Sequence, residues 1–281
     1  MKNETWIESQ LADARRDGLE RTIRPLPRNG GKFELDGRET LNFSSNDYLD
    51  LARQPEVIEV ARRALDEQGV GATASRLVTG ALPLHQQLED RLARLKGYPD
   101  ALLFGSGFLT NVGTIPAVVG RNDHIFADRL IHASMIDAAT LSRARIHRFR
   151  HNDMDHLENL LRKSPEGRRL ILAESVYSMD GDLAPVAAMT ELSERYGAMI
   201  MIDEAHAMGI FGRQGCGRVR EHGLEDRVNL SMGTLSKALG GYGGFVACSE
   251  SFRAFLVNRA RSFIYTTALP PASVGAALGA L

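Results

Sequence analysis

Lys237 is the lysine whose surroundings favour chemistry. Five of the 34 basic residues are lysines, and four of them lie in polar or helical stretches that predict surface positions, namely Lys2, Lys32, Lys96 and Lys163. Lys237 instead follows Thr234 and Ser236 in a segment rich in glycine, and glycine lets backbone amides approach a ligand closely. A lysine withdrawn from water in such a pocket has a lowered pKa and can form a Schiff base. The alternative is an exposed lysine in a flexible loop, which is the common state of this residue type.

The segment Asp203-Glu-Ala-His206 follows an apolar run at residues 198–202. Its letters match the DEAH box of helicases, but the sequence lacks the Gly-x-x-x-x-Gly-Lys-Ser/Thr loop that a helicase also needs. An aspartate at the tip of a buried strand can hold a carboxylate against a protonated ring nitrogen, which makes an aromatic cofactor an electron acceptor. Alternatively, Asp203 caps a strand-to-helix turn.

Other segments have two interpretations each. The run from Gly105 to Asn111 precedes a helical stretch whose free N–H groups could bind phosphate, although Thr110 stands where a dinucleotide fingerprint needs glycine. His132 either caps a helix or stacks on an aromatic ring. Three further histidines straddle a strand and a turn instead of sharing one helix face, so we expect no metal site at His147, His151 and His156.

Helices and strands alternate from about residue 54 onward. Short apolar runs predict strands at 101–104, 123–127, 145–149, 169–173, 198–202, 228–232 and 244–247, and helical segments lie between most of them. This alternation predicts an α/β domain with a mostly parallel central sheet flanked by helices. Ligands bind beyond the carboxyl ends of the strands in such sheets. The segments that begin at Gly105, Asp128, Glu174, Asp203 and Gly233 all follow strands, so we expect them to form one site.

The N-terminal region has a different pattern. Residues 5–24 have apolar positions at helical spacing and predict an amphipathic helix that Pro25 and Pro27 end. A hairpin turned at Asp36-Gly37 follows it.

Composition narrows the class of protein. The 281 residues are 43% hydrophobic and carry a net charge of −1, which gives a sizeable core and removes the main driving force for binding nucleic acid or an anionic membrane. The apolar runs are far too short to span a membrane, and the charged N-terminus is unlike a signal peptide. Two cysteines are too few for a disulfide framework. We therefore expect a cytoplasmic enzyme.

Taken together, Asp203-x-x-His206 and Thr234-x-x-Lys237 resemble the α-oxoamine synthases, which are fold-type-I enzymes that depend on pyridoxal 5'-phosphate (PLP). The similarity runs from about Leu41 to Pro271. Within this family, the stretches Asn42–Leu49 and Gly71–Gly80 are most similar to the 8-amino-7-oxononanoate synthases. The chain departs from the family pattern at Tyr177, where another aromatic residue is common, and at Asp50, where glycine is common.

The resemblance implies a role for each matching residue around the cofactor ring. Lys237 would carry PLP as a Schiff base, and Asp203 would pair with the pyridine nitrogen. His132 would stack on the ring, while His206 and Ser178 would contact its oxygen side. Lys237, Asp203, His132 and His206 are thus the implied catalytic residues.

The resemblance also implies how the cofactor phosphate is held. The backbone amides of Gly107 and Phe108 and the Thr234 hydroxyl would bind it. Thr267 would reach the phosphate of a neighbouring subunit, which implies a homodimer with shared active sites. Asn46 and an N-terminal arginine, Arg21 or its rival Arg24, would lie near the substrate carboxylate.

The implied fold is like that of aspartate aminotransferase. Residues 1–46 would form an N-terminal helix and hairpin segment, and residues 47–265 the large PLP-binding domain. Residues 266–281 would begin the connection to a small C-terminal domain, which we expect to be missing from this sequence.

The implied reaction joins L-alanine to pimeloyl-CoA or a pimeloyl-carrier protein, with loss of CO2, in biotin biosynthesis. One alternative is another family member, such as the glycine-using 2-amino-3-ketobutyrate CoA ligase (glycine C-acetyltransferase). Alternatives of other classes are a nucleotide- or NAD-dependent α/β protein and a non-catalytic subunit with a PLP fold. The missing phosphate-loop lysine, the missing third glycine and the intact Lys237 argue against these last three.

Overall fold

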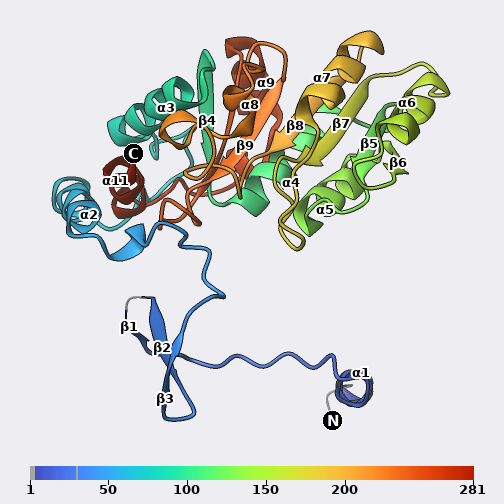
Figure 1. Cartoon of the computed structure of the whole chain (residues 1–281). Helices are drawn as coiled ribbons and strands as arrows, with labels where there is room; N and C mark the ends of the chain where they lie inside the picture. The colour runs from blue at the N-terminus through green and yellow to red at the C-terminus, as the bar shows by residue number, and fades with distance from the viewer. Residues whose placement is uncertain (1–3, 30) are drawn as a thin grey trace. The chain divides into compact units, whose positions relative to one another are not determined.

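The computed structural model describes residues 4–29 and 31–281 and contains two compact units, Met1–Ser44 and Ser45–Leu281 (Figure 1). The first unit holds helix α1 (Thr5–Arg16) and the strands β1 (Arg28–Asn29), β2 (Lys32–Leu35) and β3 (Arg38–Leu41). Strands β2 and β3 form the predicted hairpin. Its turn residues Asp36 and Gly37 have φ angles of 51° and 75°, as a two-residue turn that follows the twist of the strands requires.

The N-terminal helix is shorter than the sequence pattern predicts. The expected helix covered residues 5–24, whereas α1 ends at Arg16. Gly18 adopts a φ of 68°, and the Leu19 amide donates to the Ala14 carbonyl at 2.8 Å, which closes the last turn. The apolar spacing continues past this point, but the Asp17-Gly18 stop comes well before the two prolines.

The second unit is built on a seven-stranded sheet in the order β4-β10-β9-β8-β7-β5-β6. Strand β10 runs antiparallel to β4 and β9, and the pairs β5–β6, β5–β7, β7–β8 and β8–β9 are parallel. The strands lie within a few residues of the predicted ranges: β4 (Asp100–Phe104), β5 (His124–Asp128), β6 (Arg145–Phe149), β7 (Arg169–Glu174), β8 (Met199–Asp203), β9 (Leu230–Thr234) and β10 (Gly244–Cys248).

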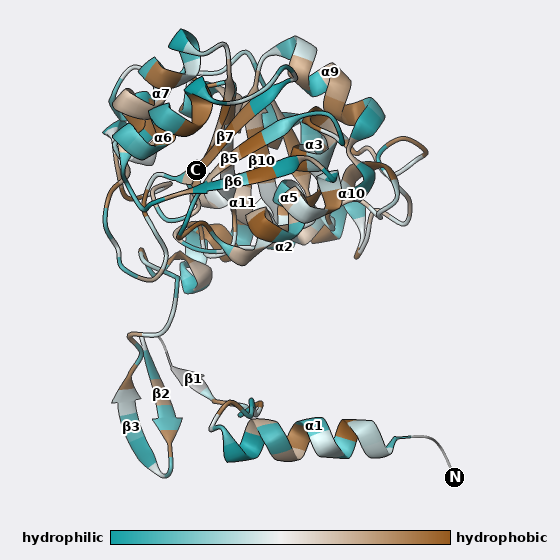
Figure 2. Cartoon of the chain, turned by 90° about the vertical axis from the view of Figure 1, so that its right-hand side faces the viewer, coloured by the Kyte–Doolittle hydropathy of each residue, from teal (hydrophilic) through white to brown (hydrophobic). Residues whose placement is uncertain are grey.

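Helices cover both faces of this sheet. Figure 2 shows α6 and α7 on one side of strands β5 and β7 and α5 on the other, with the apolar strands between them. The helices are α2 (Pro55–Gln68), α3 (Pro83–Lys96), α4 (Gly107–Val118), α5 (Ala133–Ser142), α6 (Met154–Arg162), α7 (Val186–Arg195), α8 (Arg218–Glu221), α9 (Glu250–Arg259), α10 (Arg261–Ile264) and α11 (Pro271–Ala280), with 3-10 turns η1 (Leu51–Arg53) and η2 (Arg213–Gly215). Every residue of β5, β9 and β10 is buried, as expected for strands covered on both faces. Within residues 4–29 and 31–281, no helix has the length and apolar character needed to cross a membrane.

Helix α11 packs tightly on α2 because both carry small residues where they touch. A Cβ atom built on Gly275 would lie 2.6 Å from the Ala64 Cβ and 2.8 Å from the Val60 carbonyl oxygen. Any side chain at Gly275 would therefore push the helices apart.

A buried ion pair corrects one expectation from the sequence. Lys96, which was expected at the surface, is fully buried at the end of α3 and forms an ion pair with Glu204, which is also fully buried. Lys96 also donates to the Cys216 carbonyl at 2.7 Å, and the Ser231 hydroxyl and the Val219 amide donate to Glu204 at 2.9 Å each. The long apolar stem of lysine can pack at a helix interface, and the carboxylate of Glu204 compensates the buried positive charge.

Candidate active site

Five strand ends bring polar side chains into one pocket of about 180 Å³. Strands β4, β5, β7, β8 and β9 each lead into a segment that lines it, so the expected convergence is confirmed. The lining residues are Ser106, Gly107, Phe108, Asn111, His132, Ser134, Glu174, Asp203, Ala205, His206, Met232, Thr234, Ser236 and Lys237.

Lys237 follows β9 in a loop whose shape depends on glycine. Gly243 has a φ of 136°, and a Cβ there would lie 2.8 Å from the Leu235 Cδ1 atom. The Lys237 Nζ atom lies 2.6 Å from the His206 Nε2 atom. Burial lowers the pKa of Lys237, while the charges of Asp203 and Glu174 raise it in part. The lysine is thus partly withdrawn from water, as a Schiff-base lysine must be.

His206 is the acceptor of this contact. Burial and the neighbouring charge of Lys237 lower the pKa of His206 to about 4, so the ring is neutral and carries one proton. Nε2 accepts from the Lys237 ammonium, which places that proton on Nδ1, 2.7 Å from the Tyr48 hydroxyl oxygen. The Tyr48 hydroxyl then donates to the Asn46 Oδ1 atom at 3.1 Å. Asn46 is thereby connected to the pocket through Tyr48.

Asp203 ends β8 and is 4% exposed. Its Oδ1 atom accepts from the Ala205 amide at 2.9 Å and stabilises the turn after β8, but residues 205–210 form turns and not a helix, so Asp203 is not a helix N-cap. Its Oδ2 atom accepts from the Asn111 amide nitrogen at 3.0 Å, and Asp203 lines the pocket, so its role beside a cofactor ring stays a prediction. A carboxylate with hydrogen bonds at both oxygens is well suited to remain charged beside a cationic partner.

His132 is the N-cap of α5 and is held in one tautomer. Its Nδ1 atom accepts from the Ser134 amide at 3.2 Å and lies 2.7 Å from the Ser134 hydroxyl. Because that hydroxyl accepts from Asn111 at 2.9 Å, its own proton is directed to His132. The His132 proton is therefore on Nε2, where the ring acts as a donor.

The start of α4 presents free N–H groups beside the pocket. Ser106 caps this helix through its hydroxyl, which accepts from the Leu109 amide at 3.1 Å. The following N–H groups of Gly107 and Phe108 are in the first helical turn, where they lack partners within the helix. A Cβ on Gly107 would lie 3.4 Å from the Thr234 Oγ1 atom, so the helix end and this hydroxyl are adjacent.

The residues present fit PLP, the cofactor that the resemblance implies. The lysine of the pocket suits the aldehyde of PLP, and its buried carboxylate suits the pyridinium. The histidine donor can lie against the aromatic ring, and the helix N-terminus suits the phosphate. Two buried oxygens of the pocket, Asn111 Oδ1 and Glu174 Oε1, have no hydrogen-bond partner among the described residues. Such unpaired atoms indicate a site shaped for a bound polar molecule.

Four of the predicted site residues do not line this pocket; Asn46 is connected to it through Tyr48, and the other three are Ser178, Thr267 and Arg21. Ser178 is half-buried in the loop after β7, and its amide interacts with Glu174. Thr267 is exposed and lies near Arg76 and Gly105, while Arg21 belongs to the N-terminal unit. The roles of these residues, like those of the predicted residues that line the pocket, stay predictions.

Sequence reasoning gave no role to four residues of the site: Tyr48, Asn111, Ser134 and Glu174. Asn111 lies one turn into an apolar helix and is 1% exposed, and a buried amide in such a helix is itself a signal of a polar partner. Glu174 ends a buried strand beside Asp203, so the strand pattern could have identified it.

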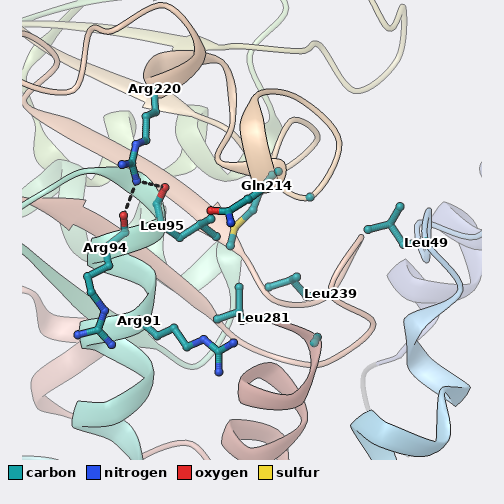
Figure 3. A pocket seen from close by; sticks show the side chains of 12 residues that line it. Leu49, Arg91, Arg94, Leu95, Gln214, Arg220, Leu239 and Leu281 are labelled. Carbon is teal, nitrogen blue, oxygen red and sulfur yellow. Dashed lines mark hydrogen bonds between the residues drawn. The ribbon is translucent and has the colours of Figure 1, made fainter.

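Figure 3 shows a larger pocket of about 450 Å³ near the end of α3 and Leu281. Arg220 there donates to the Leu95 carbonyl at 2.7 Å and to the Arg94 carbonyl, and so satisfies the last carbonyls of α3. Its lining shares no residue with the Lys237 pocket and, among the described residues, includes no carboxylate side chain, histidine or lysine. The larger pocket is therefore not the candidate active site, although its volume is greater.

Comparison with known proteins agrees with this geometry. Residues 38–281 match the family model described as aminotransferase class I and II. The chain is 47% identical over 277 residues to an 8-amino-7-oxononanoate synthase of Geobacter sulfurreducens, covering 98% of this chain and 71% of the relative. It is 51% identical over 241 residues to a putative 8-amino-7-oxononanoate synthase of Halalkalibacterium halodurans, covering 86% of this chain and 61% of that protein.

Two solved structures are also similar. A serine palmitoyltransferase of S. paucimobilis, with a bound PLP-myriocin adduct, has a TM-score of 0.90 at 30% identity and covers 99% of this chain and 73% of its own. An 8-amino-7-oxononanoate synthase of Francisella tularensis has a TM-score of 0.73 at 30% identity, over 84% of this chain and 66% of its own. The chain therefore belongs to the aminotransferase class I and II family and, within it, to the 8-amino-7-oxononanoate synthases.

Proposed function

We propose that the chain is a PLP-dependent C-acyltransferase of biotin biosynthesis that makes 8-amino-7-oxononanoate. Its substrates are L-alanine and the pimeloyl thioester of CoA or of a carrier protein. A bond forms between the alanine Cα and the thioester carbonyl carbon, the C–S bond breaks and the thiol leaves. The alanine carboxylate departs as CO2, and a proton returns to Cα. The observation that carries this proposal is the 2.6 Å contact of Lys237 Nζ with a neutral His206, in one pocket with the Asp203 carboxylate.

PLP, when bound, supplies an aldehyde that captures the amino-acid nitrogen and a ring that accepts electrons. Lys237 would hold this aldehyde, and the Asp203 carboxylate would face the ring nitrogen. The Gly107 and Phe108 amides with the Thr234 hydroxyl would hold the phosphate. These assignments rest on the lining of one pocket and on the adjacency of the α4 N-terminus to Thr234.

Proton transfer falls to Lys237. Its lowered pKa makes the free amine available as a base for the alanine Cα proton. The neutral His206 lies within reach of Nζ and can accept a proton from it. Lys237 can then return a proton to the same carbon after CO2 leaves.

The histidine tautomers favour His132 for polarising the thioester oxygen. The contacts of Ser134 put the His132 proton on Nε2, whereas the contact with Lys237 makes His206 Nε2 an acceptor. A group that stabilises a developing oxyanion must donate a hydrogen bond. We infer that His132 donates to this oxygen and that His206 serves Lys237.

The test uses the purified full chain with PLP. Borohydride reduction and peptide mapping should place the pyridoxyl label on Lys237, and Lys237→Ala should carry none. Alanine should change the cofactor absorbance at lower concentration than glycine, and pimeloyl-CoA should give product where acetyl-CoA does not. Label on another lysine would overturn the cofactor assignment. A preference for glycine with acetyl-CoA would instead favour the glycine C-acetyltransferase reaction.

A further inference from the structure

Glu174 and Asp203 are two carboxyl groups that face one pocket. They are paired in the register of the parallel strands β7 and β8, so their side chains leave the sheet on the same side. Their exposures are 2% and 4%, and both line the Lys237 pocket. Two adjacent carboxyl groups shielded from water repel each other when both are charged, so the site favours keeping a proton on one of them.

The hydrogen bonds indicate which carboxyl group keeps the proton. Asp203 accepts from the Ala205 amide at one oxygen and from the Asn111 side chain at the other. The backbone amides of His132 and Ser178 also meet Glu174, but its Oε1 atom is buried without a partner among the described residues. Hydrogen bonds from donors stabilise the charged form, and an unpaired buried oxygen does not. The charge therefore belongs on Asp203 and the proton on Glu174.

We propose that Glu174 holds a proton in the active site and presents a neutral hydrogen-bond donor beside the Asp203 carboxylate, aimed at an acceptor oxygen of the bound molecule. The identity of that molecule rests on the proposed function, but the protonated state of Glu174 does not. A neutral acid here adds a donor without adding a second negative charge next to Asp203. The proposed reaction offers acceptors for such a donor, because its substrates and cofactor carry several oxygen atoms.

The groups around Glu174 agree with this state. Burial, and then the charge of Asp203, raise the pKa of Glu174 to about 8, while the amides of His132 and Ser178 and the charge of Lys237 oppose the rise. Tyr177, on the loop after β7, is a further titratable neighbour, and burial raises its pKa so that it stays neutral, while His132 and His206 line the same pocket. Lys237 is the cation that opposes the protonated form, and its own pKa is lowered by burial.

The sign of the linkage defines a test on the apoprotein. A carboxyl group whose pKa is about 8 when folded and 4.5 when unfolded stabilises the fold fully below pH 4.5. This contribution is lost as the pH rises from 4.5 to 8, and above pH 8 no more is lost. Glutamine has nearly the same shape as a protonated glutamate and does not titrate.

The experiment compares the melting temperature of wild type and Glu174→Gln from pH 5 to pH 9, without cofactor. The difference in favour of Glu174→Gln should grow across this range and level off near pH 8. Glu59→Gln, on the exposed face of α2, is the matched control and should follow the wild type. A difference that stays constant with pH, or one in favour of wild type at pH 9, would overturn the proposal.

The wild-type protein supports a second measurement, which holds even if Glu174→Gln does not fold. Infrared spectra should contain the carbonyl stretch of a protonated carboxyl group at pH 7, and this band should disappear as the pH rises through about 8. Its absence at pH 7 would contradict the proposal. PLP binding by the wild type is measured separately, so a failure of the proposed function is not mistaken for a failure of the Glu174 assignment.

Discussion

The Lys237 ammonium donates a hydrogen bond to the His206 imidazole, with 2.6 Å between Nζ and Nε2. The same imidazole meets the Tyr48 hydroxyl at 2.7 Å through Nδ1. Because a neutral imidazole donates at one nitrogen and accepts at the other, Tyr48 determines which side of His206 faces Lys237. Tyr48, at the start of the second unit, thus contacts the histidine that faces the lysine.

Tyr48→Phe removes this constraint with little change in shape. We expect kcat to fall about 5-fold, since a single hydrogen bond contributes on the order of 1 kcal/mol. The pH profile of kcat should shift, because the pKa of the Lys237–His206 pair changes, while PLP stays bound. Tyr196→Phe, which removes a hydroxyl contact to Glu158 between α6 and α7, is the control and should leave the profile unchanged. An unchanged pH profile in Tyr48→Phe would show that Tyr48 has no such role.

His206 predicts how the apoprotein behaves in acid. Its pKa is lowered from 6.5 to about 4, so the neutral ring stabilises the fold above pH 6.5 and this contribution is lost as the pH falls to about 4. The melting temperature of His206→Asn should therefore fall less than that of wild type between pH 7 and pH 4. His222→Asn, at a histidine that contacts Arg218, is the control. Parallel melting curves for wild type and His206→Asn would be incompatible with a buried neutral His206.

Asp203→Asn tests the charge partner of the cofactor ring. Asparagine keeps the oxygen that accepts from the Ala205 amide, so the turn after β8 should persist. Loss of a preorganised charge of this kind costs about 3 kcal/mol or more, which is about a 100-fold loss of kcat. Turnover is measured beside cofactor content, which should be partly retained. Turnover near that of wild type would rule out the role.

The buried ion pair of Lys96 and Glu204 should stabilise the fold next to the segment that carries Asp203 and His206. Lys96→Met leaves a buried carboxylate without its cation, and we expect a loss of about 3–5 kcal/mol in the free energy of unfolding. Adding Glu204→Gln should restore part of it, because the uncompensated charge is gone. Arg62→Met breaks an exposed pair with Glu59 and should cost less than about 1 kcal/mol in the same urea titration. A loss of that smaller size in Lys96→Met would mean that the pair contributes little.

The periodic pattern was enough to predict the sheet, because strands covered on both faces must be continuously apolar, as at Arg169–Glu174 and Met199–Asp203. It also predicted the convergence of Lys237, Asp203 and His132, since parallel strands end at one edge. It failed at Gly18, where a left-handed backbone ends a helix whose apolar spacing continues.

The partners of the site residues could not be predicted in the same way. Lys96 and Glu204 are 108 residues apart, and nothing local to Lys96 distinguishes it from a surface lysine. The same holds for Tyr48 and His206, which meet across 158 residues. Local patterns identify residues at strand ends, but the tautomer of a histidine or the charge of a carboxyl group depends on contacts distant in sequence.

Thr267 tests the proposed homodimer with shared active sites. It is exposed and, among the described residues, is not part of the lining of its own chain's Lys237 pocket. If it reaches the cofactor phosphate of a second subunit, it adds a hydrogen bond to a charged group, worth about 1.5–3 kcal/mol. PLP would then bind more weakly to dilute, dissociated protein, and PLP would stabilise the dimer. The alternative is that Thr266 and Thr267 only end the segment before Pro270.

Heterodimers separate these two cases. One subunit carries Lys237→Ala and the other carries Thr267→Ala, and distinct affinity tags allow the mixed species to be isolated. If Thr267 acts across the interface, one site collects both lesions, whereas the other combines an intact Lys237 with an intact Thr267 from its partner. Activity should then return to about half of the wild-type value per dimer, since one of two sites is whole. If Thr267 acts within its own chain, each site keeps one lesion. The isolated heterodimer should then have no more than half of the activity of the Thr267→Ala homodimer, because only one of its two sites keeps Lys237. That second result would refute the shared site.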